Sequence, residues 1–254
     1  MGNQLFQYCF GKWLSSSRQI RIFYDARSLS NSQTPRTFEL SAFSLYHSRE
    51  TDFILSDNGG LAGGYAAIIR RISLQTEQDI DRGVASGYFE GYWQDHRFVD
   101  AVFDDKSFTF IRPPTLSPFP ASMAGRTLVA VHVRGGDYLS HPTLVRLTRN
   151  YYLTGMEYLS RMGEDPVFCV FTDDREYARQ LLAGVSCHFL PSGGTVEDLY
   201  WMSLCNHLIM ANSTFSWWAS MLNSVPSRMV VCPSRWQDGS ASRLIRPEFI
   251  TIDP

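Results

Sequence analysis

Hydrophobic residues in the second half of the chain alternate between short apolar runs and a helical spacing. Residues 128–133 and 167–171 are largely apolar and of strand length, which is typical of strands buried in a parallel sheet. Between them, Tyr152, Met156 and Leu159 recur at the i, i+4, i+7 spacing of an amphipathic helix. Strands that alternate with helices through short turns predict right-handed βαβ units and an α/β fold.

The same alternation continues toward the C-terminus. Further strands are expected at residues 187–190, 207–211 and 229–232. Asp174 and Ser213 are expected to cap the helices that follow two of the strands, because both side chains accept hydrogen bonds from free backbone N–H groups. Thr195, followed three positions later by Asp198, predicts an acidic variant of the capping box at another helix start.

The first half of the chain is less regular. Residues 4–17 predict an amphipathic helix, and residues 19–24 predict a strand. Residues 113–120 contain four prolines, which excludes a helix or a central strand and indicates a domain boundary. We therefore expect an N-terminal domain at residues 1–112, a Pro-rich linker at residues 113–125 and a C-terminal domain at residues 126–254.

Charge and hydropathy exclude two classes of protein. The 254-residue chain has 23 basic and 25 acidic residues and a formal net charge of −2. Domains that bind the nucleic-acid backbone usually carry a strong basic excess, so no nucleic-acid partner is expected. The apolar runs are too short to cross a bilayer, and no signal-peptide pattern stands at the start of the sequence.

Cysteines and acidic pairs predict no metal site. The five cysteines form no C-x-x-C pair, so we expect buried thiols in a reducing compartment rather than disulfides or a zinc site. Asp79 and Asp81 have the spacing of a metal-bound diphosphate motif. Polar residues precede them instead of an apolar strand, so we expect a solvated turn there and no metal cofactor.

The segment after the first strand of this half is a candidate anion site, because ligands of parallel sheets bind beyond the carboxyl ends of the strands. It contains His132, Arg134, Gly135, Gly136 and Asp137. Adjacent glycines let backbone N–H groups approach a ligand, and an arginine fork matches phosphate oxygens. A simple strand-to-loop turn with a surface arginine explains the same residues equally well.

A second polar cluster stands where another strand meets a helix. Asn212, Ser213, Thr214 and Ser216 gather there, and hydroxyls with free N–H groups at a helix start favour an anion site. Asp173 is a candidate acceptor for ribose hydroxyls. The sequence lacks P-loop, G-x-G-x-x-G, G-x-S-x-G and H-E-x-x-H motifs. These observations favour a nucleotide-bound ligand held by arginine, hydroxyls and helix dipoles without magnesium.

Five ordered motifs in these segments give the sequence a close resemblance to glycosyltransferase family 11, the α-1,2-fucosyltransferase family. They lie at residues 2–8, 91–94, 132–138, 171–174, and 197–200 with 211–218. Residues 132–138 resemble the family motif H-x-R-R-G-D-Y, and residues 2–8 resemble the end of its N-terminal Gly-rich motif. Since the sequence begins inside that Gly-rich loop, the N-terminal domain is expected to lack its first strand.

The resemblance implies a GT-B-like fold, with two Rossmann-type domains whose parallel sheets face a cleft. It implies an inverting, metal-independent transfer of L-fucose from GDP-fucose to the 2-hydroxyl of a galactose-containing glycan. The enzyme would act in the cytoplasm or peripherally at the cytoplasmic face of the inner membrane. Alternatives are another fucosyl linkage, another GDP-sugar donor, or a non-catalytic relative that binds GDP-sugar or glycan.

The resemblance also assigns roles to residues. Arg134 would hold the β-phosphate with His132 beside it, and the diphosphate would be bound near the helix start by Asn212, Ser213, Thr214 and Ser216. Asp173 and Asp198 would contact ribose or guanine, and the other domain would contribute Asn3 and Gln4. Candidates for the general base are His141, Asp137 and His132. The family's second arginine is Gly135 in this sequence, and Arg146 and Arg149 are candidate substitutes.

Overall fold

The computed structural model describes residues 1–27, 29, 36–47, 52–54, 74–75, 88–104, 106–162, 165–237 and 242–254. The chain divides into two compact units, and the division falls between Ile111 and Arg112. Met1 belongs to the first unit with residues 3–111, whereas Gly2 is grouped with residues 112–254. The predicted solvated turn around Asp79 and Asp81 lies outside the described residues. Each unit is described by itself.

The C-terminal unit contains a parallel sheet, which confirms the predicted α/β class. Its described strands are β5 (Leu128–Val133), β6 (Val167–Thr172), β7 (His188–Phe189), β8 (His207–Ile209), β9 (Val230–Pro233) and β10 (Ile250–Ile252). They pair in parallel in the order β10-β9-β8-β5-β6-β7. The chain builds the sheet outward from β5 in one direction and then returns to β8 for the other, so the strand order reverses between β5 and β8.

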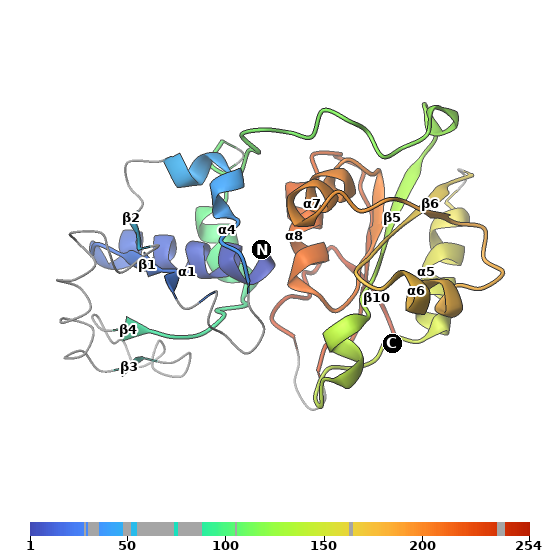
Figure 1. The fold of residues 1–254 in the computed structure, drawn as a ribbon. Coiled ribbons are helices and arrows are strands. Elements are labelled where there is room, and N and C mark those ends of the chain that lie inside the picture. Colours follow the sequence, from blue (N-terminus) through green and yellow to red (C-terminus); the bar gives the residue numbers. More distant parts are fainter. Residues whose placement is uncertain are drawn as a thin grey trace. The chain divides into compact units, whose positions relative to one another are not determined.

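Helices cover both faces of this sheet. They are α5 (Arg149–Ser160), α6 (Arg175–Leu181), α7 (Thr195–Ser203) and α8 (Thr214–Leu222). Figure 1 shows α5 and α6 on one face of the sheet and α7 and α8 on the other. Two short 3-10 helices, η4 (Ala121–Met123) and η5 (Gly136–Ser140), lie within the predicted linker and after β5. The arrangement is a doubly wound sheet.

Helix caps follow the sequence predictions at two of three sites. Asp174 accepts a hydrogen bond from the backbone N–H of Tyr177, and Ser213 accepts one from Phe215. The predicted capping box at Thr195 is wrong, because Thr195 is the first helical residue and Gly194 occupies the N-cap without a side-chain bond. Gly194 adopts a φ of 111°, a conformation open mainly to glycine.

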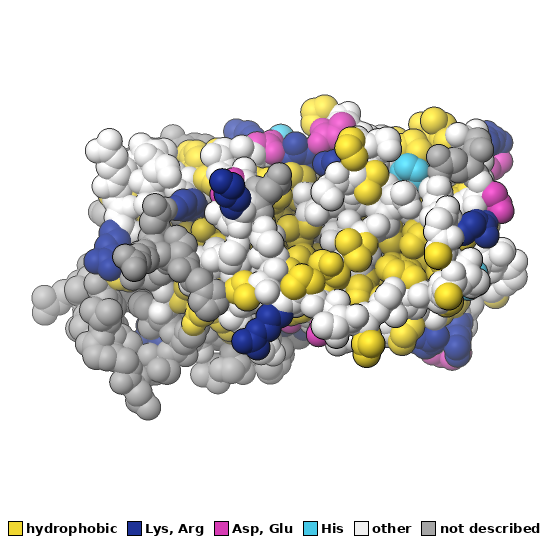
Figure 2. All heavy atoms as spheres, turned by 90° about the horizontal axis from the view of Figure 1, so that it is seen from above, with side chains coloured by type: hydrophobic (Ala, Val, Ile, Leu, Met, Phe, Trp, Pro, Cys, Tyr) yellow, Lys and Arg dark blue, Asp and Glu magenta, His cyan; other side chains and the backbone are white. Residues whose placement is uncertain are grey.

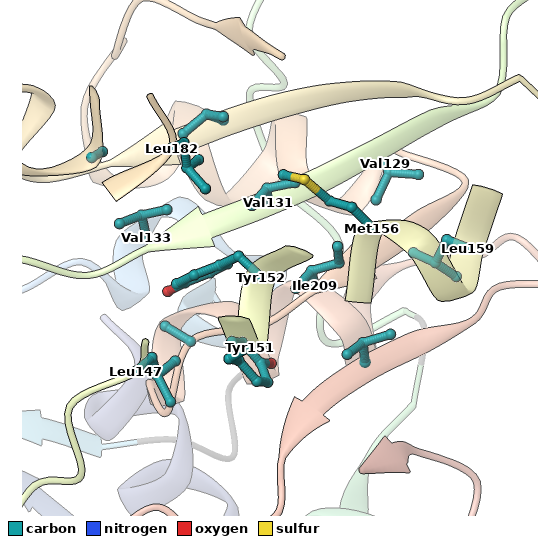
Figure 3. Close-up of a cluster of buried hydrophobic side chains, with 14 residues drawn as sticks. Val129, Val131, Val133, Leu147, Tyr151, Tyr152, Met156, Leu159, Leu182 and Ile209 are labelled. Atoms are coloured by element: carbon teal, nitrogen blue, oxygen red, sulfur yellow. The ribbon is translucent and has the colours of Figure 1, made fainter. Parts of the chain in front are cut away.

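The main core lies between β5, β8 and α5. In Figure 3, Tyr152 and Met156 of α5 lie over Val131 and Ile209 of the sheet, and all four are buried. Gly155 allows this close approach, because a Cβ there would stand 3.3 Å from side-chain atoms of Ile209. Burying these side chains removes apolar surface from water at roughly 25 cal/mol per Å² and fixes α5 against the sheet.

Buried tyrosines tie α5 to the strand ends. The Tyr151 hydroxyl donates to the carbonyl of Met210 at 2.6 Å, just beyond β8. The Tyr152 hydroxyl donates to the carbonyl of His132 at 3.2 Å, near the end of β5. Since a buried hydroxyl without a partner is costly, both bonds favour one placement of the helix. The two neighbouring strand ends are thereby held by one helix.

The described part of the N-terminal unit contains one long helix and short strands. Its elements are α1 (Gly2–Arg18), β1 (Phe23–Asp25), η2 (Leu40–Ala42), η3 (Ser44–His47), β2 (Asp52–Ile54), β3 (Leu74–Gln75), β4 (Tyr88–Phe89) and α4 (His96–Val102). β1 pairs in parallel with β2, and β3 with β4. The expected helix is confirmed with one to two more residues at each end, whereas the expected strand is reduced to three residues.

Two of the family-like motifs are joined inside this unit. The ring of Phe10 on α1 stacks on Trp93 with centroids 4.0 Å apart. The Gln7 amide donates to the carbonyl of Gly91 at 2.9 Å, and the Gln94 amide donates to Oδ1 of Asn3 at 3.0 Å. Residues 2–8 and 91–94 therefore contact each other. The hydrogen bonds of their polar side chains stabilise this unit.

The described residues have scattered surface charges and free thiols. On the face drawn in Figure 2, basic and acidic side chains lie in small separate groups among hydrophobic and neutral ones. Within the described ranges, no helix has the length and apolar character needed to span a membrane. All five cysteines are free, and burial raises the pKa of the Cys205 thiol. Among the residues that the structure describes, no cluster of potential ligands could hold a metal ion.

Candidate functional site

The candidate site lies where the strand order of the large sheet reverses. β5 and β8 are hydrogen-bonded neighbours, and their carboxyl ends lead into residues 134–138 and 210–216. In open parallel sheets, a crevice forms at such a point because the two connections leave in opposite directions. Both candidate polar clusters of the sequence therefore meet at one edge of the sheet.

Arg134 is fixed by partners on three sides. Its Nη2 lies 2.8 Å from Oδ1 of Asp137, and its Nη1 lies 2.9 Å from Oδ2 of Asp173. The guanidinium carbon stands 4.9 Å from the ring centroid of Tyr138, a cation–π contact. The Nε atom is buried and has no hydrogen-bond partner in the described part of the chain. Arg134 is thus preorganised, and its buried Nε is one of the donors that remain unused.

The two glycines after Arg134 fit the space around them. The N–H of Gly135 donates to Oδ1 of Asp173 at 2.9 Å. A Cβ at Gly135 would stand 2.5 Å from the Cβ of Asp174, the residue that caps α6. Gly136 has a φ of +49° and lies against Asp173. An arginine at position 135 therefore has no room unless the start of α6 moves.

His132 is a neutral histidine in this site. Its side chain is 3% exposed, and its ring lies 5.6 Å from that of Phe215. Burial, followed by the positive charge of Arg134, lowers the pKa of His132 from 6.5 to about 3. Its Nδ1 atom has no hydrogen-bond partner among the residues described. His132 can offer a neutral hydrogen-bonding group to a ligand but not a positive charge.

A small cavity opens beside Arg134. Its volume is about 10 Å³, close to the space that one water molecule needs. Polar side chains from several elements reach its wall, among them Arg134, Tyr138, Arg146, Tyr177 and Asn212. The second arginine comes from the loop before α5. Two arginines therefore line one small cavity at the end of the sheet, together with apolar side chains such as Leu139 and Leu147.

The cluster after β8 uses most of its polar groups internally. The Asn212 amide donates to the carbonyls of Val145 at 2.8 Å and Trp236 at 3.0 Å. The buried Ser216 hydroxyl lies 3.3 Å from the carbonyl of Ala211, to which it donates. Ser213 caps α8, and Thr214 is only partly buried. Asn212, Ser213 and Ser216 thus each have a structural role in this segment.

The two aspartates predicted to contact ribose or guanine lie at different strand ends. Asp173 follows β6 and engages both Arg134 and Gly135. Asp198 lies in the first turn of α7, where it accepts hydrogen bonds from the Ser192 hydroxyl at 2.6 Å and the Gly193 N–H at 3.0 Å. Burial raises the pKa of Asp198 despite these bonds. The structure brings Asp173 to Arg134 and places Asp198 in the first turn of α7, bonded to Ser192 and Gly193.

The three candidate bases differ in their surroundings. Asp137 is exposed and paired with Arg134, and His132 is buried as the second-last residue of the strand β5. His141 is exposed at the end of η5, where its Nδ1 accepts a long bond of 3.4 Å from the Thr143 N–H. The geometry therefore brings Asp137 and His132 next to Arg134 and leaves His141 at the outer end of the loop.

Asn3 and Gln4, the candidates from the N-terminal unit, are bonded within that unit. The Gln4 side chain is buried, donates to the carbonyl of Thr37 at 2.7 Å and accepts from the N–H of Glu39 at 2.9 Å. Asn3 accepts the bond from Gln94 described above. Both ends of the Gln4 amide are therefore used to hold residues 37–39 against α1.

Sequence reasoning missed two tyrosines of the site. Tyr138 follows the glycines and supplies the ring under Arg134, and it also hydrogen-bonds Ser213. An aromatic residue four positions after an arginine is a weak signal that could have suggested this stacking. Tyr177 reaches the cavity from α6, and nothing in its local sequence distinguishes it from an ordinary helix residue.

Comparison with known proteins now adds to this geometry. The model of the family described as glycosyl transferase family 11 matches residues 86–252, well over half of the chain. The chain belongs to glycosyl transferase family 11. The matched region of this family 11 chain contains every predicted site residue of the C-terminal unit, from His132 to Ser216.

Individual relatives match different shares of this family 11 protein. An α-1,2-colitosyltransferase of Escherichia coli is 25% identical over 282 aligned positions, which cover 100% of this chain and 93% of that protein. The O-antigen biosynthesis glycosyltransferase WbnK of Escherichia coli is 30% identical over 132 residues, 48% of this chain and 44% of that protein. Galactoside α-(1,2)-fucosyltransferase 1 of Leontopithecus chrysomelas is 33% identical over 106 residues, 38% of this chain and 29% of its own length.

A solved structure of the fucosyltransferase NodZ from Bradyrhizobium is similar to this family 11 chain at a TM-score of 0.44 and 12% identity. The match covers 87% of this chain and 89% of that chain.

Proposed function

We propose that this family 11 glycosyltransferase moves L-fucose from GDP-fucose to the 2-hydroxyl of a galactoside in a glycan, with inversion and without a metal ion. The observation that carries the proposal is Arg134, which Asp137 and Asp173 hold in the wall of the cavity at the strand-order reversal. Family membership and the names of the fucosyl- and colitosyltransferase relatives support the class of donor.

The reaction needs charge stabilisation at the leaving group. The bond between the anomeric carbon and the β-phosphate oxygen breaks, and the 2-hydroxyl oxygen of the acceptor bonds to that carbon from the opposite face. Negative charge grows on the departing GDP, and donors fixed in advance around it lower the barrier. Arg134 supplies such donors, and neutral His132 is placed to supply or accept one hydrogen bond beside it.

The acceptor hydroxyl must also lose its proton. An effective general base has a pKa near the working pH, and the pKa of His132, lowered to about 3, makes it a poor base. Asp137 and His141 remain the candidates of this chain for that step. Asp137 would have to exchange its contact with Arg134 for one with the acceptor.

A second candidate is the transfer of colitose in place of fucose. It is favoured by one observation, the colitosyltransferase that aligns with the whole of this chain. The remaining alternative is not an enzyme but a non-catalytic relative that binds GDP-sugar or glycan. It is suggested by Gly135, at the position where the family has a second arginine. We place the activity in the cytoplasm or at the cytoplasmic face of the inner membrane, consistent with an O-antigen biosynthesis enzyme among the relatives.

Measuring sugar transfer from different donors distinguishes these functions. The protein is incubated with GDP-fucose, with other GDP-sugars or with nucleotide-activated colitose, each with a panel of galactosides and with or without a chelator. We expect GDP release with GDP-fucose, an α-1,2 linkage by NMR and no effect of the chelator. Preferred turnover of the colitose donor supports the second candidate. Donor binding without product at any acceptor supports the non-catalytic alternative, and a rate that depends on a metal contradicts the metal-free mechanism.

A further inference from the structure

Arg146 is a second cation in the wall of the cavity beside Arg134. Its Nη2 donates to the carbonyl of Leu139 at 2.7 Å, and it interacts electrostatically with Tyr177 in the same wall. In the described ranges, no carboxylate forms an ion pair with it. Since arginine has five N–H donors, most of the donors of this exposed side chain remain available to a ligand.

The charge around Arg134 explains why a second cation matters. Arg134 is paired with both Asp137 and Asp173, which leaves these three groups with a net charge of −1. A diphosphate that approaches Arg134 therefore also approaches two carboxylates. Interactions between charges a few ångströms apart are substantial in a partly buried site, so this repulsion opposes binding. Arg146 adds a positive charge that offsets the second carboxylate around Arg134.

We infer that Arg134 and Arg146 together form a subsite for the diphosphate of the nucleotide, with Arg146 as a binding residue for the phosphate that Arg134 alone cannot neutralise. The inference rests on the proposed function and deepens it. It is supported by the packing at Gly135, where Asp174 fills the space that a neighbouring arginine would need. The second cation comes instead from the loop before α5.

Arg149 provides a matched comparison for Arg146. It lies three residues further along, at the first position of α5, and its Nη1 donates to the carbonyl of Leu181 at 2.8 Å. Both arginines are exposed, and both hydrogen-bond a backbone carbonyl. Arg149 does not line the cavity. The two side chains thus differ mainly in their place relative to Arg134.

The experiment measures diphosphate binding by calorimetry with wild-type protein, Arg146→Gln, Arg146→Lys and Arg149→Gln. The probes are GDP, UDP, ADP, inorganic pyrophosphate and guanosine. We expect Arg146→Gln to weaken the binding of GDP and of pyrophosphate by roughly ten- to a hundred-fold. That is the range for the loss of one charge-assisted hydrogen bond. Arg146→Lys should recover part of this loss, and Arg149→Gln should stay within about two-fold of wild type because an exposed charge away from the ligand has little effect. Thermal unfolding checks that each variant is folded.

The outcomes separate this inference from the proposed function. Unchanged diphosphate binding in folded Arg146→Gln overturns the subsite, as does an equal loss in Arg149→Gln, and so does a wild-type protein that binds no diphosphate. A loss of guanosine affinity as large as the loss of GDP affinity also overturns the subsite, because guanosine carries no phosphate. If UDP or ADP binds best and still depends on Arg146, the subsite stands and the GDP-sugar assignment is wrong.

Discussion

The segments that follow β5 and β8 use their polar side chains in opposite ways. At the carboxyl end of β5, His132 and Arg134 keep one buried nitrogen each without a hydrogen-bond partner in the part of the chain described. After β8, Asn212 and Ser216 donate to backbone carbonyls and are buried. Buried polar groups nearly always find partners, so an unpaired one is a stronger sign of ligand binding than a paired one.

The comparison shows why counting polar residues is a weak guide to binding. Hydroxyl groups at a helix start favoured the segment after β8 as the anion site. Those groups are also the ones that cap helices and satisfy backbone carbonyls, as Ser213 and Ser216 do. Only their partners in the fold distinguish the two uses. The contact between Thr214 and a ligand stays a prediction.

The largest expected effect is the loss of activity on removing Arg134. Arg134→Ala should lower kcat/KM for sugar transfer by roughly 10²–10³-fold or more, because it removes donors aimed at the leaving group. Arg134→Lys should restore little, since lysine lacks the planar fork. Initial rates of GDP release measure kcat/KM for each variant. A folded Arg134→Ala enzyme with most of the wild-type kcat/KM would remove Arg134 from its proposed role.

Ser216→Ala is the matched variant from the other segment. It should cost about 1 kcal/mol of stability, because the Ala211 carbonyl loses its hydroxyl donor, while kcat/KM stays near that of wild type. A large loss of kcat/KM with unchanged thermal unfolding would instead make the segment after β8 a binding segment, and the contrast between the two segments would disappear.

A side chain at Gly135 is expected to change stability rather than catalysis directly. Gly135→Ala should destabilise the C-terminal unit by roughly 1–3 kcal/mol, because the new Cβ overlaps the side chain of Asp174. In an Asp174→Gly background most of this cost should disappear. Urea unfolding of both single variants and the double variant measures the coupling. An equal cost of Gly135→Ala in the two backgrounds would contradict the packing argument, as would a higher kcat/KM in Gly135→Arg.

The last expected effect is the pH dependence of stability due to His132. The unfolded chain takes up a proton on this histidine near pH 6.5, whereas the folded protein does so only near pH 3. As pH falls below 6.5, the wild type should lose up to about 1.4 kcal/mol per pH unit from this group. His132→Gln should lack that component, and His188→Gln, at an exposed histidine of β7, should retain it.

Urea unfolding between about pH 4.5 and pH 7 measures this slope. Parallel curves for wild type and His132→Gln would mean that His132 is protonated in the folded protein. In that case the residue would add a positive charge next to Arg134, and its description as a neutral group would be wrong.

Sequence pattern predicted the strongly periodic elements and failed where tertiary structure decides. The apolar run 128–133 became β5 at the predicted bounds, because a strand buried on both faces needs apolar residues throughout. The edge strand Ile250–Ile252 was missed, since its apolar residues Ile250 and Ile252 flank a polar Thr251 and form no continuous apolar run. The capping box failed because Asp198 bonds Ser192 and Gly193 instead.

The candidate site was predictable in part. The rule that ligands bind beyond parallel strands pointed to Arg134 and its neighbours, and the structure does bring Asp137 and Asp173 to it. What could not be predicted is which polar groups are already satisfied by the backbone. Tyr177 lies 43 positions from Arg134 in the sequence, and only the packing of α6 brings it to the same cavity.

The contact between Gly135 and Asp174 also constrains how this protein can evolve. A side chain at position 135 of this chain therefore requires a shift of the start of α6 or a smaller residue at 174, and the second change also removes the cap of that helix.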